Sequence, residues 1–192
     1  FVISVFKKNK PMPFYQTRGE IPTKRHTQFR DDTGNLYWEE LISREGFSHM
    51  YSNIYHVYPP TSVEAIGELK KYNLKAVDQT HRHHHIRTAN VESNGDAISS
   101  RIPLFFNSDV VISKAHVTDS MNTLYRNGNA DEVLFIHTGS GLFKSNFGNM
   151  KVKSGDYLLI PRGVIWQMDV KQPIRILVIE TSGPIETPTR YR

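Results

Sequence analysis

Four of the nine histidines in this 192-residue chain lie within the five positions His81-Arg-His-His-His85. Alternate side chains of an extended strand share a face, so His81, His83 and His85 would point the same way. Two imidazoles at that spacing can hold a metal ion, but a stable site needs further ligands and hydrogen bonds that orient them. The cluster therefore makes these three histidines candidates for a metal site.

The residues around the cluster argue against a metal. Arg82 and Arg87 would repel a cation, and Asp78 is the only carboxylate at close spacing in the sequence. We therefore expect a solvent-exposed or subunit-facing strand here rather than a metal centre. His81, His83 and His85 are kept as the metal candidates that the sequence offers.

The composition limits other kinds of chemistry. The chain has no cysteine, which excludes disulfides, Cys-based zinc sites and a thiol nucleophile. It has no phosphate-cradling glycine loop, no Gly-x-Ser-x-Gly motif and no His-Glu-x-x-His motif. His137 could serve as a general base, although a histidine at a strand end more often hydrogen-bonds a loop carbonyl. The motifs alone therefore indicate no particular reaction.

Nothing in the sequence suggests a membrane partner. No apolar run approaches the roughly 20 residues that span a bilayer. Residues 1–6 are apolar and are followed by lysines, which is the reverse of the order in a signal peptide. The absence of cysteine fits a reducing compartment. We expect a cytoplasmic protein.

The positive charge is concentrated at the start of the chain. Residues 1–30 carry seven Lys and Arg against one Glu, a net +6, so the other 162 residues sum to −1 of the total +5. A basic arm can contact nucleic acid, and a basic-armed nucleic-acid binder is one alternative. Since no recognisable reading module accompanies it, we expect no nucleic-acid partner but a solvated arm or a strap across a neighbouring subunit.

Two short helices are predicted near this arm. Residues 36–44 place Leu, Tyr and Glu side chains at i,i+4 spacing, and Gly46 follows as a stop signal. A second helix is expected from Thr61 to about Tyr72, because Thr61 and Glu64 have the spacing of a capping box.

Most of the remaining sequence is typical of strands. Short β-branched and aromatic runs recur at roughly ten-residue spacing between turn residues, which indicates an antiparallel sandwich or barrel. We predict a basic arm with a short helix over residues 1–50 and a β-sandwich over residues 51–192. The expected strands are 53–58, 102–106, 110–117, 132–137, 142–146, 150–153, 157–160, 165–170 and 174–180.

Two stretches, Asp131–Gly139 and Gly155–Trp166, resemble the two signature motifs of the cupin double-stranded β-helix. In the first, a Glu stands seven residues before a Gly, as in that family. In the second, the Gly-Asp and Pro-x-Gly elements match. The resemblance implies a mainly β fold, a cupin-like antiparallel β-sandwich, here with an N-terminal arm and two short helices.

The cupin metal ligands are missing from these motifs. Tyr125-Arg-Asn-Gly128 stands where the family has paired histidines, four to seven residues before Glu132, and Trp166 replaces the last histidine. Indole has no lone pair free to coordinate and Arg126 is cationic, so a His/carboxylate site cannot assemble here. We expect a cupin-like shell without a metal.

Longer stretches resemble one enzyme family. Met12–Arg30, Leu36–Thr61 and Glu180–Arg192 are similar to the bacterial type of homogentisate 1,2-dioxygenase. The resemblance implies an oxidoreductase of tyrosine and phenylalanine catabolism that cleaves homogentisate with O₂ to maleylacetoacetate. It also implies non-haem Fe(II), held by two His and one carboxylate that leave positions open for substrate and O₂.

Family members are longer than this chain, and their iron ligands lie in the C-terminal half. We therefore expect no catalytic, cofactor-binding or metal-binding residue here, the catalytic residues lying beyond Arg192. This chain would be an inactive N-terminal domain, with Fe(II), homogentisate and O₂ bound by the full-length enzyme. The resemblance further implies a homo-oligomer, a trimer or a dimer of trimers. The alternative is a stand-alone, metal-free cupin-like module that binds a small ligand.

Overall fold

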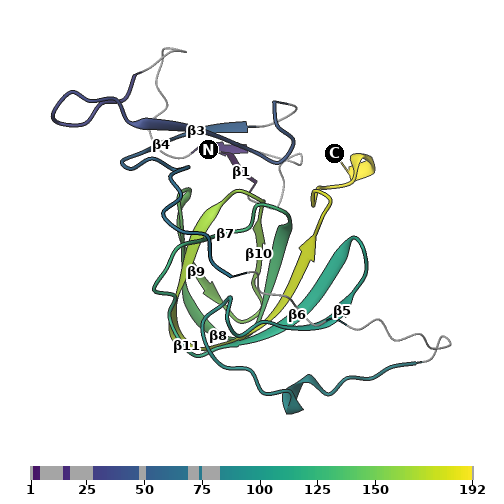
Figure 1. Cartoon of the computed structure of the whole chain (residues 1–192). Coiled ribbons are helices and arrows are strands. Elements are labelled where there is room, and N and C mark those ends of the chain that lie inside the picture. Colours follow the sequence, from purple (N-terminus) through teal and green to yellow (C-terminus); the bar gives the residue numbers. More distant parts are fainter. Residues whose placement is uncertain are drawn as a thin grey trace. The chain divides into compact units, whose positions relative to one another are not determined.

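A computed structural model describes residues 2–4, 15–17, 28–47, 51–68, 74 and 83–191 (Figure 1). The chain divides into two compact units. The smaller unit comprises Phe1–Ala65 with Glu186–Arg192, and the larger comprises Ile66–Ile185.

The smaller unit contains two antiparallel strand pairs. β1 (Val2–Ser4) pairs with β2 (Tyr15–Thr17), and β3 (Trp38–Ser43) pairs with β4 (Tyr51–His56). The strand predicted over residues 53–58 is confirmed as β4, with both ends two residues earlier.

The first predicted helix is wrong, because residues 38–43 form strand β3 instead. Its side chains pair across the hairpin: Glu40 Oε2 hydrogen-bonds His56 Nε2 at 2.8 Å, and Asn53 Nδ2 donates to Glu39 Oε1 at 2.8 Å. Helix propensity is a weak prior that such cross-strand pairing overrides.

The second predicted helix is also not found in the described part of its range. Residues 61–68 are irregular and exposed, and residues 69–72 lie outside the described residues. A short helix gains most of its stability by burying one face, which residues 61–68 do not do. The described helical residues are two 3₁₀ turns, η1 (Thr88–Asn90) and η2 (Thr189–Tyr191). Over the described ranges no helix is long and apolar enough to cross a membrane.

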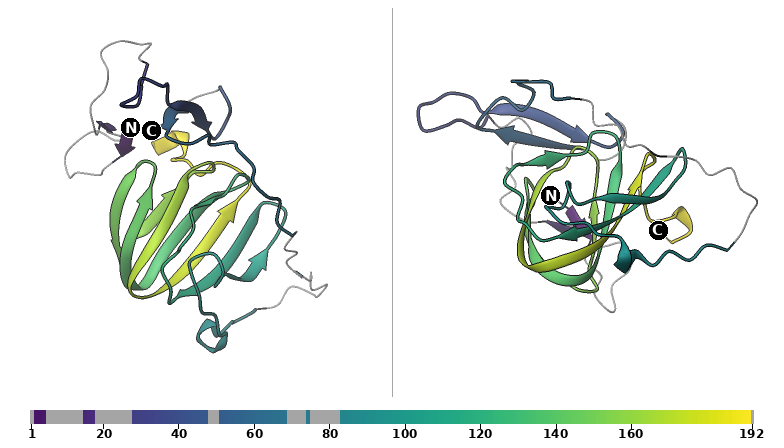
Figure 2. Two further views of the ribbon diagram at one scale, coloured as in Figure 1. Left: turned by 60° about the vertical axis from the view of Figure 1, so that its left-hand side comes forward. Right: turned by 60° about the horizontal axis from the view of Figure 1, so that its bottom comes forward.

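The larger unit is a seven-stranded antiparallel sheet that curls into a barrel-like shape (Figure 2). The strand order is β10-β8-β11-β6-β5, with β9 added to β8 and β7 added to β11. The mainly β, antiparallel class predicted from the sequence is confirmed. The strands are β5 (Ile102–Phe106), β6 (Val110–Val117), β7 (Tyr125–Arg126), β8 (Asp131–Ser145), β9 (Gly148–Lys153), β10 (Tyr157–Ile160) and β11 (Ile165–Thr181).

The two longest strands bend where the sequence predicted breaks. β8 and β11 continue through residues 139–141 and 171–173, while their pairing register shifts between Val170 and Ile176. Gly139 has φ +88°, and a Cβ there would collide with the backbone of Pro173. Glycine lets β8 bend without ending, and the shifted register of β11 accommodates the bend.

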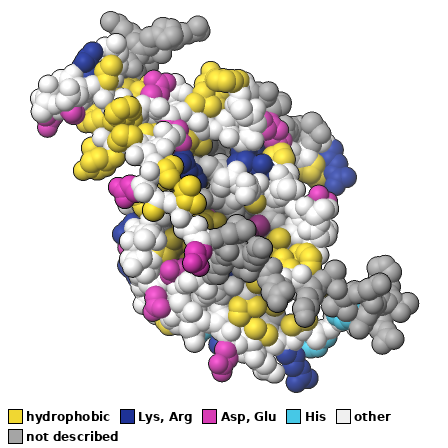
Figure 3. Space-filling view, viewed as in Figure 1, with side chains coloured by type: hydrophobic (Ala, Val, Ile, Leu, Met, Phe, Trp, Pro, Cys, Tyr) yellow, Lys and Arg dark blue, Asp and Glu magenta, His cyan; other side chains and the backbone are white. Residues whose placement is uncertain are grey.

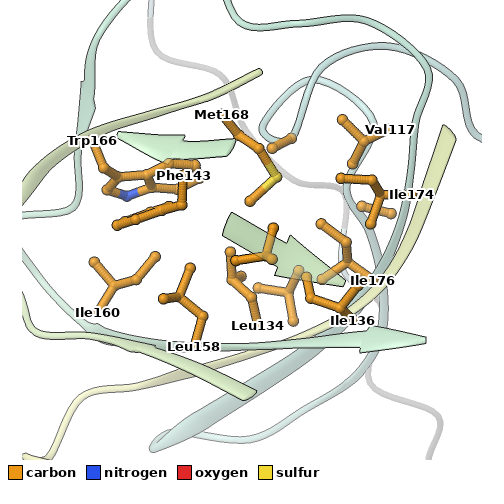
Figure 4. Packing of buried hydrophobic residues seen from close by; sticks show 14 of the residues in the cluster. Val117, Leu134, Ile136, Phe143, Leu158, Ile160, Trp166, Met168, Ile174 and Ile176 are labelled. Atoms are coloured by element: carbon orange, nitrogen blue, oxygen red, sulfur yellow. The ribbon is translucent and has the colours of Figure 1, made fainter. Parts of the chain in front are cut away.

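The interior of this unit is a packed apolar core (Figure 4). Alternate residues of β8 and β11 point inward, among them Leu134, Ile136 and Met168, all fully buried. The rings of Phe143 and Trp166 lie 5.5 Å apart between their centroids. Side chains therefore fill the space that a ligand would need inside the barrel.

Candidate functional site

The structure brings together side chains from both cupin-like motifs. Tyr125 and Asn127 are half-buried, whereas Arg126 between them is exposed. Glu132 and Trp166 are fully buried. The Tyr125 ring stands edge-on to Trp166 with 5.5 Å between the centroids. Tyr125, Asn127, Glu132 and Trp166 all lie in or beside the two stretches that resemble the cupin motifs, and Tyr125 and Trp166 are in contact.

Arg101, which sequence patterns did not identify, completes this group. Its Nη1 donates to Glu132 Oε1 at 2.5 Å and lies 3.5 Å from Glu180 Oε1. Its Nε donates to the Ala97 carbonyl at 3.0 Å, and its Cζ lies 5.7 Å from the Tyr125 ring centroid. We call Arg101, Tyr125, Asn127, Glu132, Trp166 and Glu180 the arginine cluster.

Two carboxylates of the arginine cluster face each other across neighbouring strands. Glu132 on β8 is the direct partner of Glu180 on β11. Like charges opposite each other destabilise a sheet, and a cation between them offsets the repulsion. Burial and the charge of Glu132 raise the pKa of Glu180 above its ordinary value, against the opposing effects of Arg101 and of the 3.2 Å hydrogen bond from Asn127. Burial disfavours the charge of Arg101, but Glu132 outweighs it and raises the pKa of the guanidinium.

Short side-chain turns hold the cluster residues in place. Asp96 Oδ1 accepts hydrogen bonds from the backbone N–H groups of Ile98 and Ser99, each at 2.8 Å, and so shapes the loop that leads to Arg101. Asn127 Oδ1 similarly accepts from two backbone N–H groups, of residues 129 and 130, each at 3.0 Å. Asn and Asp favour such turns because their side chains replace a backbone acceptor.

Asp131 is buried beside Glu132 but has a different role. Its Oδ1 accepts from the backbone N–H of Arg162 at 3.0 Å, and its Oδ2 accepts from that of Ile185 at 3.0 Å. Arg162 also donates from Nη2 to the Ser182 carbonyl at 2.6 Å. Asp131 therefore ties the Pro-x-Gly turn of the second motif to the start of β8, which is a structural role.

Three buried polar atoms of the cluster lack a hydrogen-bond partner within the described residues. They are Arg101 Nη2, Glu132 Oε2 and Trp166 Nε1. Such atoms are rare in folded proteins, because each forfeits the hydrogen bonds it made with water. The cluster thus retains unsatisfied donors and an unsatisfied acceptor.

A pocket of about 390 Å³ adjoins the cluster. This volume lies within the range of roughly 300–1,000 Å³ for small-molecule sites. Its walls combine apolar and polar side chains, including Leu74, Ile98, Pro103, Val110 and Val111 together with Arg101, Tyr125, Asn127 and Glu180.

The side chains of the cluster do not fit an iron ion. Oxygenases hold Fe(II) with two histidines and one carboxylate. Here the carboxylate is Glu132, and its Oε1 is already engaged by a guanidinium 2.5 Å away. Tyr125, Asn127 and Trp166 supply no imidazole. Within the described ranges no group of three or more His, Cys, Asp or Glu is placed to hold a metal ion.

The histidine cluster lies apart from this site. His83 and His85 are exposed in an irregular segment over residues 83–87, so the strand expected there is wrong for the described residues. Figure 3 shows histidine side chains at the surface of the molecule. His81 lies outside the described residues. The exposed His137 contributes its backbone carbonyl, which accepts from Ser154 Oγ at 2.7 Å.

Comparison with known proteins identifies relatives of the chain. The family model described as "Homogentisate 1,2-dioxygenase N-terminal" matches residues 48–189. A protein of Saccharolobus solfataricus named "Putative dioxygenase SSO1533" is 40% identical over 183 residues, covering 94% of this chain and 47% of the relative. The chain therefore spans about half the length of this curated relative.

Solved cupin structures are more distant. A cupin protein from Bacteroides fragilis is 20% identical, with a TM-score of 0.40 over 64% of this chain and 95% of that one. A cupin-2 domain containing protein from Shewanella frigidimarina is 21% identical, with a TM-score of 0.39 over 43% of this chain and 79% of that one.

Proposed function

The chain belongs to the homogentisate 1,2-dioxygenase N-terminal family, and we propose that it is the non-catalytic N-terminal domain of an enzyme that cleaves the homogentisate ring with O₂. The product would be maleylacetoacetate, an intermediate of tyrosine and phenylalanine catabolism. The observation that carries this proposal is the family match over residues 48–189. The relative named as a dioxygenase supports the reaction class.

In this proposal the chemistry takes place in a second domain that follows Arg192. Fe(II) bound there would supply coordination positions for the substrate and O₂. The present chain would supply a rigid neighbouring barrel, because its corresponding site holds the Arg101–Glu132 ion pair rather than a set of metal ligands.

We further infer that the full-length enzyme is a homo-oligomer, a trimer or a dimer of trimers, to which this chain contributes contacts. The hairpin of β3 and β4 supports this, because it exposes the large apolar side chains of Leu41 and Tyr51 on one face and of Trp38 on the other. Exposed apolar groups on one element are typical of interaction surfaces. Light scattering on Trp38→Lys/Tyr51→Lys and on the unaltered protein tests this inference. A mass that is unchanged by the two substitutions contradicts it.

The experiment for the proposed activity uses the complete gene product. It should convert homogentisate to maleylacetoacetate, followed by the absorbance of the product, and a chelator of ferrous iron should stop the reaction. A complete product that cleaves another dihydroxylated ring in preference to homogentisate would contradict the proposed substrate. A complete product without oxygen-dependent activity would contradict the enzyme class.

The pocket beside the arginine cluster favours a second candidate, a metal-free module that binds a small ligand. The packed core leaves the barrel interior full, so a ligand would sit in this pocket of about 390 Å³. An NMR titration of the chain with homogentisate, following the side-chain amide signal of Asn127, distinguishes the ligand-binding module from the dioxygenase domain. A saturable shift of that signal without turnover supports the module, whereas the dioxygenase-domain reading predicts no shift.

A further inference from the structure

We propose that the guanidinium of Arg101 takes the structural place of a metal ion in this barrel. It is the buried cation around which Glu132, Glu180 and Tyr125 are arranged. This inference rests on the contacts of the arginine cluster and on the motif positions, and it stands independently of the substrate and of the reaction.

The charges of the cluster require a cation. Glu132 is fully buried, and Glu180 is its direct partner on the neighbouring strand. A buried carboxylate without a countercharge is strongly destabilising, because it has lost its hydration. Nη1 of Arg101 lies 2.5 Å from the first carboxylate and 3.5 Å from the second, so a single cation serves both.

The shape of the guanidinium suits this role better than an ammonium group would. Nη1 faces the two carboxylates, Nε donates to the Ala97 carbonyl, and the plane of the group lies near the Tyr125 ring. A planar, delocalised cation can make these three kinds of contact at once, whereas the ammonium of lysine is a compact and strongly hydrated charge. Arg101 therefore links the loop before β5 with β7, β8 and β11.

The same arrangement keeps a metal ion out. A divalent ion bound to Glu132 would lie within a few ångströms of the Arg101 charge, and like charges at that distance repel strongly in a low-dielectric interior. Trp166 and residues 125–128, where the motif resemblance would place histidines, offer no imidazole to compensate. The barrel is thus stabilised by an internal cation of its own, which leaves no room for a metal ion beside Glu132.

Chemical rescue tests the proposal. Arg101→Ala removes a fragment with the shape of ethylguanidinium. Added ethylguanidinium is therefore the probe that matches the space left by the substitution. We expect it to raise the Tm of Arg101→Ala by at least about 3 °C more than that of the unaltered protein. N-ethylurea, which is nearly isosteric but neutral, is the control and should leave the Tm unchanged. The rescue should disappear in Arg101→Ala/Glu132→Gln, which lacks the buried carboxylate.

A second pair of variants covers the case in which Arg101→Ala does not fold. Arg101→Met leaves Glu132 without its cation, and adding Glu132→Gln removes the uncompensated charge. The double variant should therefore unfold at a higher urea concentration than Arg101→Met alone. Rescue by N-ethylurea as large as by ethylguanidinium, or a double variant no more stable than Arg101→Met, would overturn the proposal. A Tm of the unaltered protein that rises with zinc in a Glu132-dependent manner would also overturn it.

Discussion

Nη1 of Arg101 donates a 2.5 Å hydrogen bond to Oε1 of Glu132, and the two side chains are only 4% and 0% exposed. The residues are 31 positions apart, and their contact joins the loop before β5 to the second residue of β8. A buried ion pair with this geometry is costly to break, because the remaining partner would be left as an unpaired charge. The pair therefore anchors the loop before β5 to the start of β8.

Neutralising the two carboxylates should have unequal effects. Glu132→Gln removes the direct partner of a buried cation, so we expect a loss of about 3 kcal/mol in the free energy of unfolding. Glu180 is partly exposed and lies farther from Arg101. For that reason Glu180→Gln should cost less than about 1 kcal/mol. Urea denaturation of both variants measures the difference, and equal losses would contradict the assigned geometry.

The stability of the protein should depend on pH through Glu180. Its pKa is raised in the folded state by burial and by Glu132, against Arg101 and Asn127, so the folded protein holds this proton at a higher pH than the unfolded chain does. The contribution of protonated Glu180 to the free energy of unfolding is therefore fully present below the pKa of the unfolded chain, near 4.5. It is lost as the pH rises through the higher pKa of the folded state. As the pH rises above 4.5, the urea midpoint of the unaltered protein should fall by an amount that is missing from the profile of Glu180→Gln. Parallel profiles for the two proteins would contradict this assignment.

Gly139 should tolerate substitution poorly. Gly139→Ala places a Cβ against the backbone of Pro173 and keeps an unfavourable φ of +88°, so we expect a loss above about 3 kcal/mol. Gly148→Ala is the matched control, because its φ is +114° but nothing lies within 4 Å of the added Cβ. It should lose about 1 kcal/mol from backbone strain alone. Similar losses in the two variants, measured by thermal or urea unfolding, would show that the contact with Pro173 is unimportant.

Iron content tests the histidine cluster directly. The chain purified with ferrous iron and then dialysed should retain far less than one equivalent of iron, because Arg101 occupies the cupin-like site and the exposed His83 and His85 lack further ligands among the described residues. Elemental analysis measures the metal. Stoichiometric iron that is lost in His83→Ala/His85→Ala would contradict this account.

The sequence predicted the strands well and the helices poorly. Alternating β-branched and aromatic runs gave the bounds of β5, β6 and β10 as the structure has them, since burial on one face imposes a period of two. Residues 36–44 have a helical spacing, but pairing with β4 outweighs it. The separate strands expected over 132–137 and 142–146 are the single strand β8, because local sequence does not distinguish a bend within a long strand from a break between two strands.

The candidate site was predicted in part. The motif spacing pointed to the stretch Tyr125–Gly128, to Glu132 and to Trp166, and led us to expect no metal there. It did not identify Arg101, which lies outside both motifs and reaches Glu132 through the fold of the loop before β5. The need for Arg101 follows from the burial of Glu132, because a buried carboxylate needs a cation from elsewhere in the chain, and that burial is visible only in the structure.

Oxygen uptake with homogentisate tests the central claim most directly. It should be measured side by side on this 192-residue chain and on the complete gene product, each supplied with ferrous iron. We predict that the complete product consumes O₂ and forms maleylacetoacetate, while this chain alone consumes none above the rate of free iron. Oxygen consumption and ring cleavage by the 192-residue chain alone would contradict its assignment as the non-catalytic domain.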